Sequence, residues 1–73
     1  MSVQVVTSPM QGIISSLCVA VGDEVREGDV LCLIEAMKML TPIESNVMGK
    51  VVEIYAGEKQ SVARNEKIMS IEY

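Results

Sequence analysis

The chain has 73 residues, a formal net charge of −4, and no histidine, phenylalanine or tryptophan. This length supports one domain, close to the smallest size at which a hydrophobic core sustains a fold unaided. Its six basic residues are scattered, which excludes the basic stripe of a nucleic-acid-binding protein. Without histidine the chain lacks the commonest general base and metal ligand, so we expect no catalytic residue and no metal site.

Short runs of β-branched and apolar residues follow one another along the chain, and no window has helical periodicity. The segments between these runs are rich in Gly, Pro, Asn, Asp and Ser, which is typical of turns. The predicted strands, in chain order, are Val3–Thr7, Gly12–Val19, Glu24–Arg26, Val30–Glu35, Leu40–Ile43, Gly49–Tyr55, Ser61–Ala63 and Lys67–Glu72.

No segment approaches the roughly 18 apolar residues of a membrane span, and no signal peptide opens the chain. We therefore expect no membrane insertion and a cytoplasmic location, or the mitochondrial matrix if a transit segment has been removed. Cys18 and Cys32 each lie in an apolar run. The favoured interpretation is two free thiols packed as small hydrophobic residues in a reducing compartment, and a disulfide is the alternative.

The sequence repeats itself once at an offset of 37 residues, without a gap. This offset places Gly12 on Gly49, Ile14 on Val51, Leu17 on Ile54, Val25 on Val62, Asp29 on Glu66, Leu31 on Ile68, Ile34 on Ile71 and Glu35 on Glu72. The pattern predicts two copies of a four-strand unit packed face to face, since neither copy can bury its apolar face alone. The expected fold is all-β, a flattened barrel or sandwich of two four-stranded antiparallel sheets with pseudo-twofold symmetry.

The repeat makes three further predictions. Asn65 replaces Gly28 and should adopt a positive φ, whereas Lys59 replaces Gly22 and should give its turn another shape. Lys38 is equivalent to Met1, so both chain ends should lie side by side, opposite Lys38. The residues expected to be buried are Val25, Leu31, Ile34, Ile54, Val62 and Ile71.

The segment "EAMKM", Glu35 to Met39, joins the two copies at the tip of a predicted hairpin. A lysine at such a tip is exposed, and two flexible methionines beside it suit a surface that a partner must recognise. Preceded by "VGDEV" and "GDVLCLI", this segment resembles the biotinyl domain, the biotin carboxyl carrier of biotin-dependent carboxylases and decarboxylases. The resemblance extends from Ser8 to Ile71.

The resemblance implies that residues 1–73 are a single biotinyl domain, a non-catalytic carrier with biotin in amide linkage to Lys38. It implies that Glu35, Ala36, Met37 and Met39 are recognised by a biotin protein ligase. It also implies that carboxybiotin is carried between the active sites of a biotin carboxylase and a carboxyltransferase.

Two departures from this family accompany the resemblance. The spacing from Gly12 to Gly22 leaves no room for the protruding thumb of some bacterial carriers, and the usual G-D-x-V-x-x-G pattern is replaced over Lys59–Asn65. Two alternatives stay open. A lipoyl carrier domain is similar but usually has Asp-Lys-Ala at the tip, where this chain has Met37 and Met39 around the lysine. An unmodified interaction module of the same fold is the other alternative.

Overall fold

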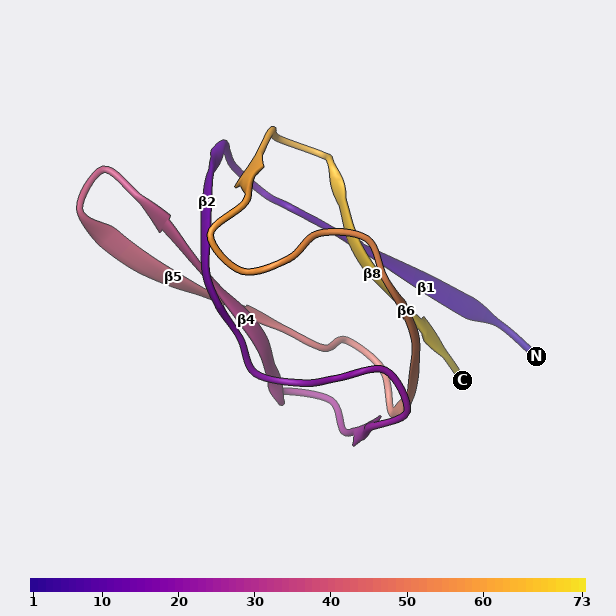
Figure 1. Ribbon diagram of the computed structural model, residues 1–73. Coiled ribbons are helices and arrows are strands. Elements are labelled where there is room, and N and C mark those ends of the chain that lie inside the picture. The colour runs from indigo at the N-terminus through magenta and orange to yellow at the C-terminus, as the bar shows by residue number, and fades with distance from the viewer.

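The computed structural model describes all residues, 1–73, as eight strands without a helix (Figure 1). The strands are β1 (Val3–Thr7), β2 (Gly12–Leu17), β3 (Glu24–Val25), β4 (Val30–Ala36), β5 (Met39–Glu44), β6 (Gly49–Ile54), β7 (Ser61–Val62) and β8 (Lys67–Glu72). All eight predicted strands are confirmed, two of them with identical bounds and the others with ends that differ by one or two residues. The structure contains no helix with the length and apolar character needed to cross a lipid bilayer.

The strands form two four-stranded antiparallel sheets, which confirms the predicted fold class. One sheet has the order β1-β8-β6-β3 and the other β5-β4-β2-β7. Each sheet therefore takes two strands from each copy of the repeat. The prediction that the copies pack face to face as separate units is wrong: they exchange strands, because β1 and β3 pair with strands of the second copy.

Backbone hydrogen bonds repeat with the sequence offset. Ser8 N–H donates to Glu66 O at 2.9 Å, and its counterpart Ser45 N–H donates to Asp29 O at 2.9 Å. The hydroxyls of the same two serines each donate to a carbonyl two residues on, at 2.6 Å in both copies. Both serines are buried. These matched contacts give the pseudo-twofold symmetry a physical basis in the turns as well as in the strands.

Backbone dihedral angles in the turns follow the repeat closely. Gly28 and Asn65 have φ of 93° and 72°, which confirms the expectation for Asn65. Gly22 and Lys59 have φ of 99° and 68°, and their N–H groups donate to equivalent carbonyls at 2.7 Å. The prediction of a different turn at Lys59 is therefore wrong. Tertiary hydrogen bonds hold this lysine in a left-handed conformation that a side chain disfavours.

The core lies between the sheets and contains aliphatic side chains, one methionine and one cysteine. Five of the six predicted core residues are buried: Val25, Leu31, Ile34, Val62 and Ile71. Ile54 is only partly buried and packs against the edge of the core, because it ends β6 at the rim of the sheet.

The two cysteines are free and have different environments. Cys32 is buried in the core as expected, but Cys18 is exposed, so the prediction that both pack as hydrophobic residues is wrong for Cys18. Cys18 follows the last residue of β2, where the chain leaves the sheet. Desolvation by burial, with a smaller effect of Cys18, raises the pKa of Cys32 from 9.0 to about 11.

The molecule is elongated, with extents of 36 × 18 × 17 Å. Ser2 and Tyr73 exchange two backbone hydrogen bonds of 2.9 Å, so the two chain ends are paired like adjacent strands. Figure 1 shows these ends at one pole and the β4–β5 hairpin extending toward the other. The predicted placement of the termini is confirmed.

Candidate functional site

The β4–β5 hairpin presents the residues that the sequence singled out. Glu35 pairs with Leu40, and Ala36 pairs with Met39, which leaves Met37 and Lys38 as a two-residue loop. Ile34 is the last fully buried residue before the loop. Beyond it the hairpin extends past the core, so the loop lies at the free end of the molecule (Figure 1).

The loop has an unusual backbone for its residues. Met37 and Lys38 have φ of 53° and 65°. Positive φ at both central residues is the geometry of a type I′ turn, whose twist matches that of the flanking strands and which normally contains Asn and Gly. Each non-glycine residue in this conformation costs on the order of 1 kcal/mol. The hairpin therefore retains two long side chains at positions where asparagine and glycine would make the turn more stable.

The side chains at the tip are accessible. Met37 is 95% exposed and Met39 is 69% exposed, while Lys38 is exposed between them. Single exposed apolar side chains are common, but two methionines on either side of one lysine form a contiguous apolar surface that a partner can contact. The tip thus offers a primary amine flanked by two thioethers.

The base of the hairpin rests on the segment before β2. A Cβ atom at Gly12 would lie 2.7 Å from the Glu35 carbonyl oxygen and 2.8 Å from Ile34 Cγ2, so only glycine permits this approach of β2 to β4. Met10 is partly buried, and its sulfur accepts from the Thr41 hydroxyl at 3.9 Å. These contacts hold the hairpin against the body of the domain while the tip stays free.

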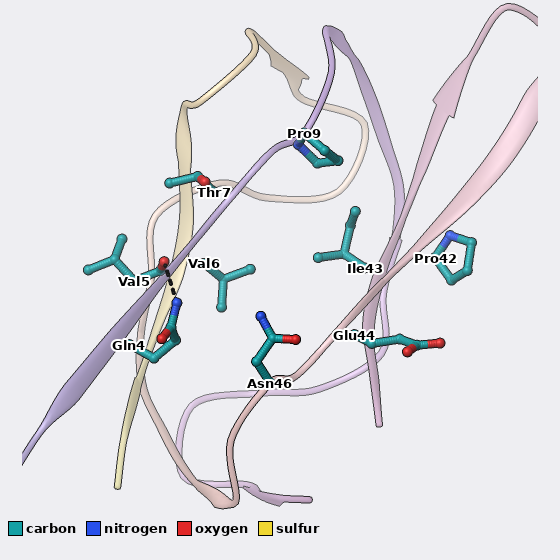
Figure 2. Close-up of a pocket in the computed structure, with 9 residues that line it drawn as sticks. All are labelled: Gln4, Val5, Val6, Thr7, Pro9, Pro42, Ile43, Glu44 and Asn46. Carbon is teal, nitrogen blue, oxygen red and sulfur yellow. Dashed lines mark hydrogen bonds between the residues drawn. The ribbon is translucent and has the colours of Figure 1, made fainter. Parts of the chain in front are cut away.

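A groove of about 260 Å³ lies between the edge strands β1 and β5 (Figure 2). Most of its lining residues are repeat-equivalent pairs, so it crosses the pseudo-twofold axis: Gln4, Val5, Val6, Thr7, Pro9, Pro42, Ile43, Glu44 and Asn46. Pro42 is the lining residue of β5 nearest to Lys38, and three residues of extended strand, about 10 Å, separate it from Met39 beside the turn. The groove is therefore separate from the hairpin tip.

Charge and ligand chemistry at the tip are simple. Glu35 is exposed on β4, three residues before Lys38. No group of three or more His, Cys, Asp or Glu side chains is arranged to hold a metal ion. The accessible groups at this end of the molecule are one amine, one carboxylate and apolar side chains.

Comparison with known proteins identifies the family to which the chain belongs. A family model described as "Biotin-requiring enzyme" matches residues 4–71. The chain belongs to this family. Members of the biotin carrier family bind biotin covalently and are carriers without catalytic groups. The exposed lysine amine at the tip of the hairpin is a group to which biotin can be attached.

The curated relatives are much longer proteins. The chain is 38% identical over 73 residues to the biotin carboxyl carrier protein of acetyl-CoA carboxylase from Nostoc sp., an alignment that covers 90% of this chain and 40% of that protein. It is 44% identical over 64 residues to the propionyl-CoA carboxylase alpha chain from Ruegeria pomeroyi, covering 88% of this chain and 9% of that one.

A solved structure supports the same assignment. The crystal structure of Kluyveromyces lactis urea carboxylase superposes with a TM-score of 0.91 at 28% identity, covering 99% of this chain and 6% of that chain. The chain therefore spans between 6% and 40% of the length of these larger proteins. The structure brings Glu35, Ala36, Met37, Lys38 and Met39 together at one hairpin end, as the sequence predicted.

Sequence reasoning did not single out Met10 and Gly12 as supports of the hairpin. The sequence indicates Gly12 only as the start of a strand and as the repeat partner of Gly49, and it gives no role to Met10. The signal was available in part, because Gly12 recurs as Gly49, which packs in the same way against the Glu72 carbonyl.

Proposed function

We propose that residues 1–73 form one biotinyl domain in which Lys38 carries biotin through an amide bond. The observation that supports this most directly is the exposed lysine on a type I′ turn at the free end of the molecule. Its two methionines are also exposed, although methionine is commonly buried. A structural role for Lys38 would instead require contacts with the body of the domain, from which the turn projects (Figure 1).

Attachment requires a partner enzyme, because the carboxyl group of biotin must be activated before an amine can attack it and the domain has no group that does so. The Lys38 ammonium must lose a proton to the ligase, and its Nζ then attacks the carboxyl carbon of an adenylate-activated biotin. The new bond is the amide, the broken bond is the carboxyl–phosphate bond, and AMP leaves. The reaction removes the positive charge of Lys38, so the net charge of the domain changes from −4 to −5.

The domain then acts as a tether. When bound, biotin supplies a ureido ring that accepts and donates a carboxyl group. The chain's own contribution is a rigid body with a flexible lysine side chain at its tip, which raises the effective concentration of the carried group near a second site. We propose that the two sites belong to a biotin carboxylase and a carboxyltransferase, and that the transferase selects the acceptor.

Ligase recognition is assigned to the residues around Lys38. Met37 and Met39 provide exposed apolar contacts, and Glu35 provides a negative charge close to the amine. Ala36 faces Met39 across the hairpin, and its small side chain leaves space beside the lysine for the partner. The two free cysteines favour a reducing compartment such as the cytoplasm.

Intact-mass measurement after co-expression with a biotin protein ligase tests the proposal. The expected gain is the mass of one biotin less one water, with the modified peptide containing Lys38. Lys38→Arg is expected to abolish labelling with an almost unchanged melting temperature, because an exposed turn residue contributes little to stability.

Label on Lys50, Lys59 or Lys67 of the folded protein would contradict the assignment. A gain equal to lipoic acid less one water would indicate a lipoyl carrier. No added mass would indicate an unmodified interaction module. A large fall in melting temperature on Lys38→Arg would show that the lysine is structural.

A further inference from the structure

A row of three side chains crosses the outer face of the hairpin sheet directly behind the tip. Ile13 on β2 pairs with Glu35 on β4, and Glu35 pairs with Leu40 on β5. Paired residues share a face of the sheet, so these three side chains stand together. Ile13 is 42% exposed and Leu40 is 56% exposed. The carboxylate of Glu35 thus lies between two exposed apolar side chains, with no cation beside it in the row.

The pseudo-twofold symmetry supplies an internal comparison for this row. On the other sheet, Lys50 pairs with Glu72, and Glu72 pairs with Val3. The offset of 37 residues relates Ile13 to Lys50, Glu35 to Glu72, and Leu40 to Val3. The same position in the fold therefore has a lysine opposite its glutamate at the pole with the chain ends. The isoleucine is not required by the fold, because the equivalent sheet position accepts a lysine.

We propose that the Ile13–Glu35–Leu40 row is a docking surface for the biotin protein ligase, which contacts it with an apolar patch around a cationic side chain. The inference rests on the proposed modification of Lys38 and extends it from the tip to the face of the sheet. Leu40 follows Met39 in β5, so the row and the exposed methionines form one continuous surface. The unpaired carboxylate at its centre complements a positive charge on the partner.

Reach identifies the ligase, among the partners of the carrier, as the protein that covers this row. An extended lysine side chain places Nζ about 6 Å from its Cα. The row lies two strand residues behind Lys38, about 7 Å in the other direction. An interface of ordinary size, roughly 800 Å² on each partner and centred on the bare amine, therefore extends far enough behind the tip to cover the row. The enzymes that act on the longer biotinylated side chain meet its far end and do not need this contact.

The test compares matched serine variants on the two sheets, using the full chain, a purified biotin protein ligase, biotin and ATP. Ile13→Ser and Leu40→Ser are each expected to lower kcat/KM for labelling about fivefold or more, as loss of a central apolar contact of an interface does. Their symmetry-related controls, Lys50→Ser and Val3→Ser, should stay within about twofold of the parent protein. Thermal unfolding of all four variants checks that the fold is retained.

The charge at the centre of the row is tested separately. Glu35→Gln is expected to lower kcat/KM, and Glu35→Lys to lower it further. Raising the salt concentration should weaken labelling of the parent protein and leave Glu35→Gln less affected, because salt screens an ion pair with the ligase. After complete labelling in long incubations, Ile13→Ser and Leu40→Ser should be carboxylated by a biotin carboxylase at the parental rate.

The outcomes separate the two proposals. Absence of label on the parent protein would overturn the function proposed for Lys38. Parental labelling rates in Ile13→Ser and Leu40→Ser, with label on Lys38, would overturn the docking surface alone. Equal losses of kcat/KM in the symmetry-related controls Lys50→Ser and Val3→Ser would also overturn the docking surface, because the loss would then not be specific to the sheet that contains Glu35. Slower carboxylation of fully labelled row variants would assign the surface to the carboxylase instead.

Discussion

Adjacent residues at the end of β4 have opposite environments. Ile34 is fully buried between the sheets, and Glu35 is exposed on the outer face. This alternation is the period-two pattern of a strand with one dry face. It places the boundary between the stabilising part of the hairpin and its functional part at a single peptide bond.

Replacement of Ile34 by alanine should therefore affect stability strongly. Ile34→Ala is expected to lower the free energy of unfolding by about 2–5 kcal/mol, because it leaves a cavity in a closely packed core. A domain of this size has little stability in excess, so partial unfolding at room temperature is expected. Urea unfolding measures the change. Ile13→Ala on the exposed face is the control, and a similar loss in both variants would contradict the assigned register.

The buried thiol of Cys32 should lower the free energy of unfolding at alkaline pH. Burial raises the pKa of its thiol from 9.0 to about 11, so the folded state holds this proton more tightly than the unfolded state. Stability from this group is complete below pH 9 and is lost as pH rises through about 11. We expect the urea midpoint of the parent protein to fall over this range more steeply than that of Cys32→Ala. Parallel profiles for the two proteins would contradict the prediction.

At the scale of single elements, the turns show how much backbone strain the fold accepts. Four non-glycine residues have a positive φ: Met37, Lys38, Lys59 and Asn65. Only asparagine adopts this conformation readily. At Lys59 the strain is balanced by hydrogen bonds to β2, since its N–H donates to Ile14 O at 2.7 Å and its Nζ to Ser15 O at 3.3 Å.

The equivalent turns at Gly22 and Lys59 therefore give a matched pair of stability variants. Lys59→Gly is expected to raise the free energy of unfolding by about 0.5–1 kcal/mol, since relief of the left-handed strain exceeds the entropy that glycine adds to the unfolded chain. Gly22→Ala should lower it by about 1 kcal/mol for conformational reasons alone, because no atom lies within 4 Å of the added Cβ. Denaturant unfolding measures both changes. If both variants changed the free energy of unfolding in the same direction, the backbone strain assigned to Lys59 would be contradicted.

The elements themselves were largely predictable from sequence, and their partners were not. Short runs of β-branched and apolar residues, separated by segments rich in turn-forming residues, located every strand. Neither signal reveals that β1 pairs with β8, because strand exchange between two similar copies leaves each local pattern unchanged. The register shift between Val30 and Cys32 was also hidden. It allows Leu31 and Cys32 to be buried together, which strict alternation forbids.

The candidate site was predictable for a different reason. Lys38 and its methionines contradict the usual preferences of a hairpin tip, so they are conspicuous in sequence. The row behind them was not recognised, because Ile13 and Leu40 have the composition of ordinary strand residues. Only the pairing of β2, β4 and β5 places them beside Glu35.

At the scale of the whole molecule, symmetry separates two poles. The hairpin loop at one pole corresponds to the paired chain ends at the other, where Ser2 and Tyr73 occupy the positions of Met39 and Ala36. One pole is a continuous turn and the other is open.

Distances between spin labels should report these poles. Labels at residues 2 and 72 are expected to be as close as neighbouring strands. Labels at residues 2 and 38 should be separated by a distance approaching the long dimension of 36 Å. Pulsed electron paramagnetic resonance of Ser2→Cys/Glu72→Cys and Ser2→Cys/Lys38→Cys, each with Cys18 replaced by serine, measures both. A shorter distance for the second pair would contradict the pseudo-twofold fold.

The paired ends also determine how such a domain can be joined to other protein. Because the two ends lie within hydrogen-bonding distance, a host polypeptide could enter and leave the domain at a single point with little loop-closure entropy. That point would act as a pivot at the pole away from Lys38. A rotation there moves the lysine through an arc whose radius is close to the full 36 Å length of the body, while the body itself stays rigid. Pairing of the two chain ends thus lets a small rotation at the attachment point move Lys38 over a large distance.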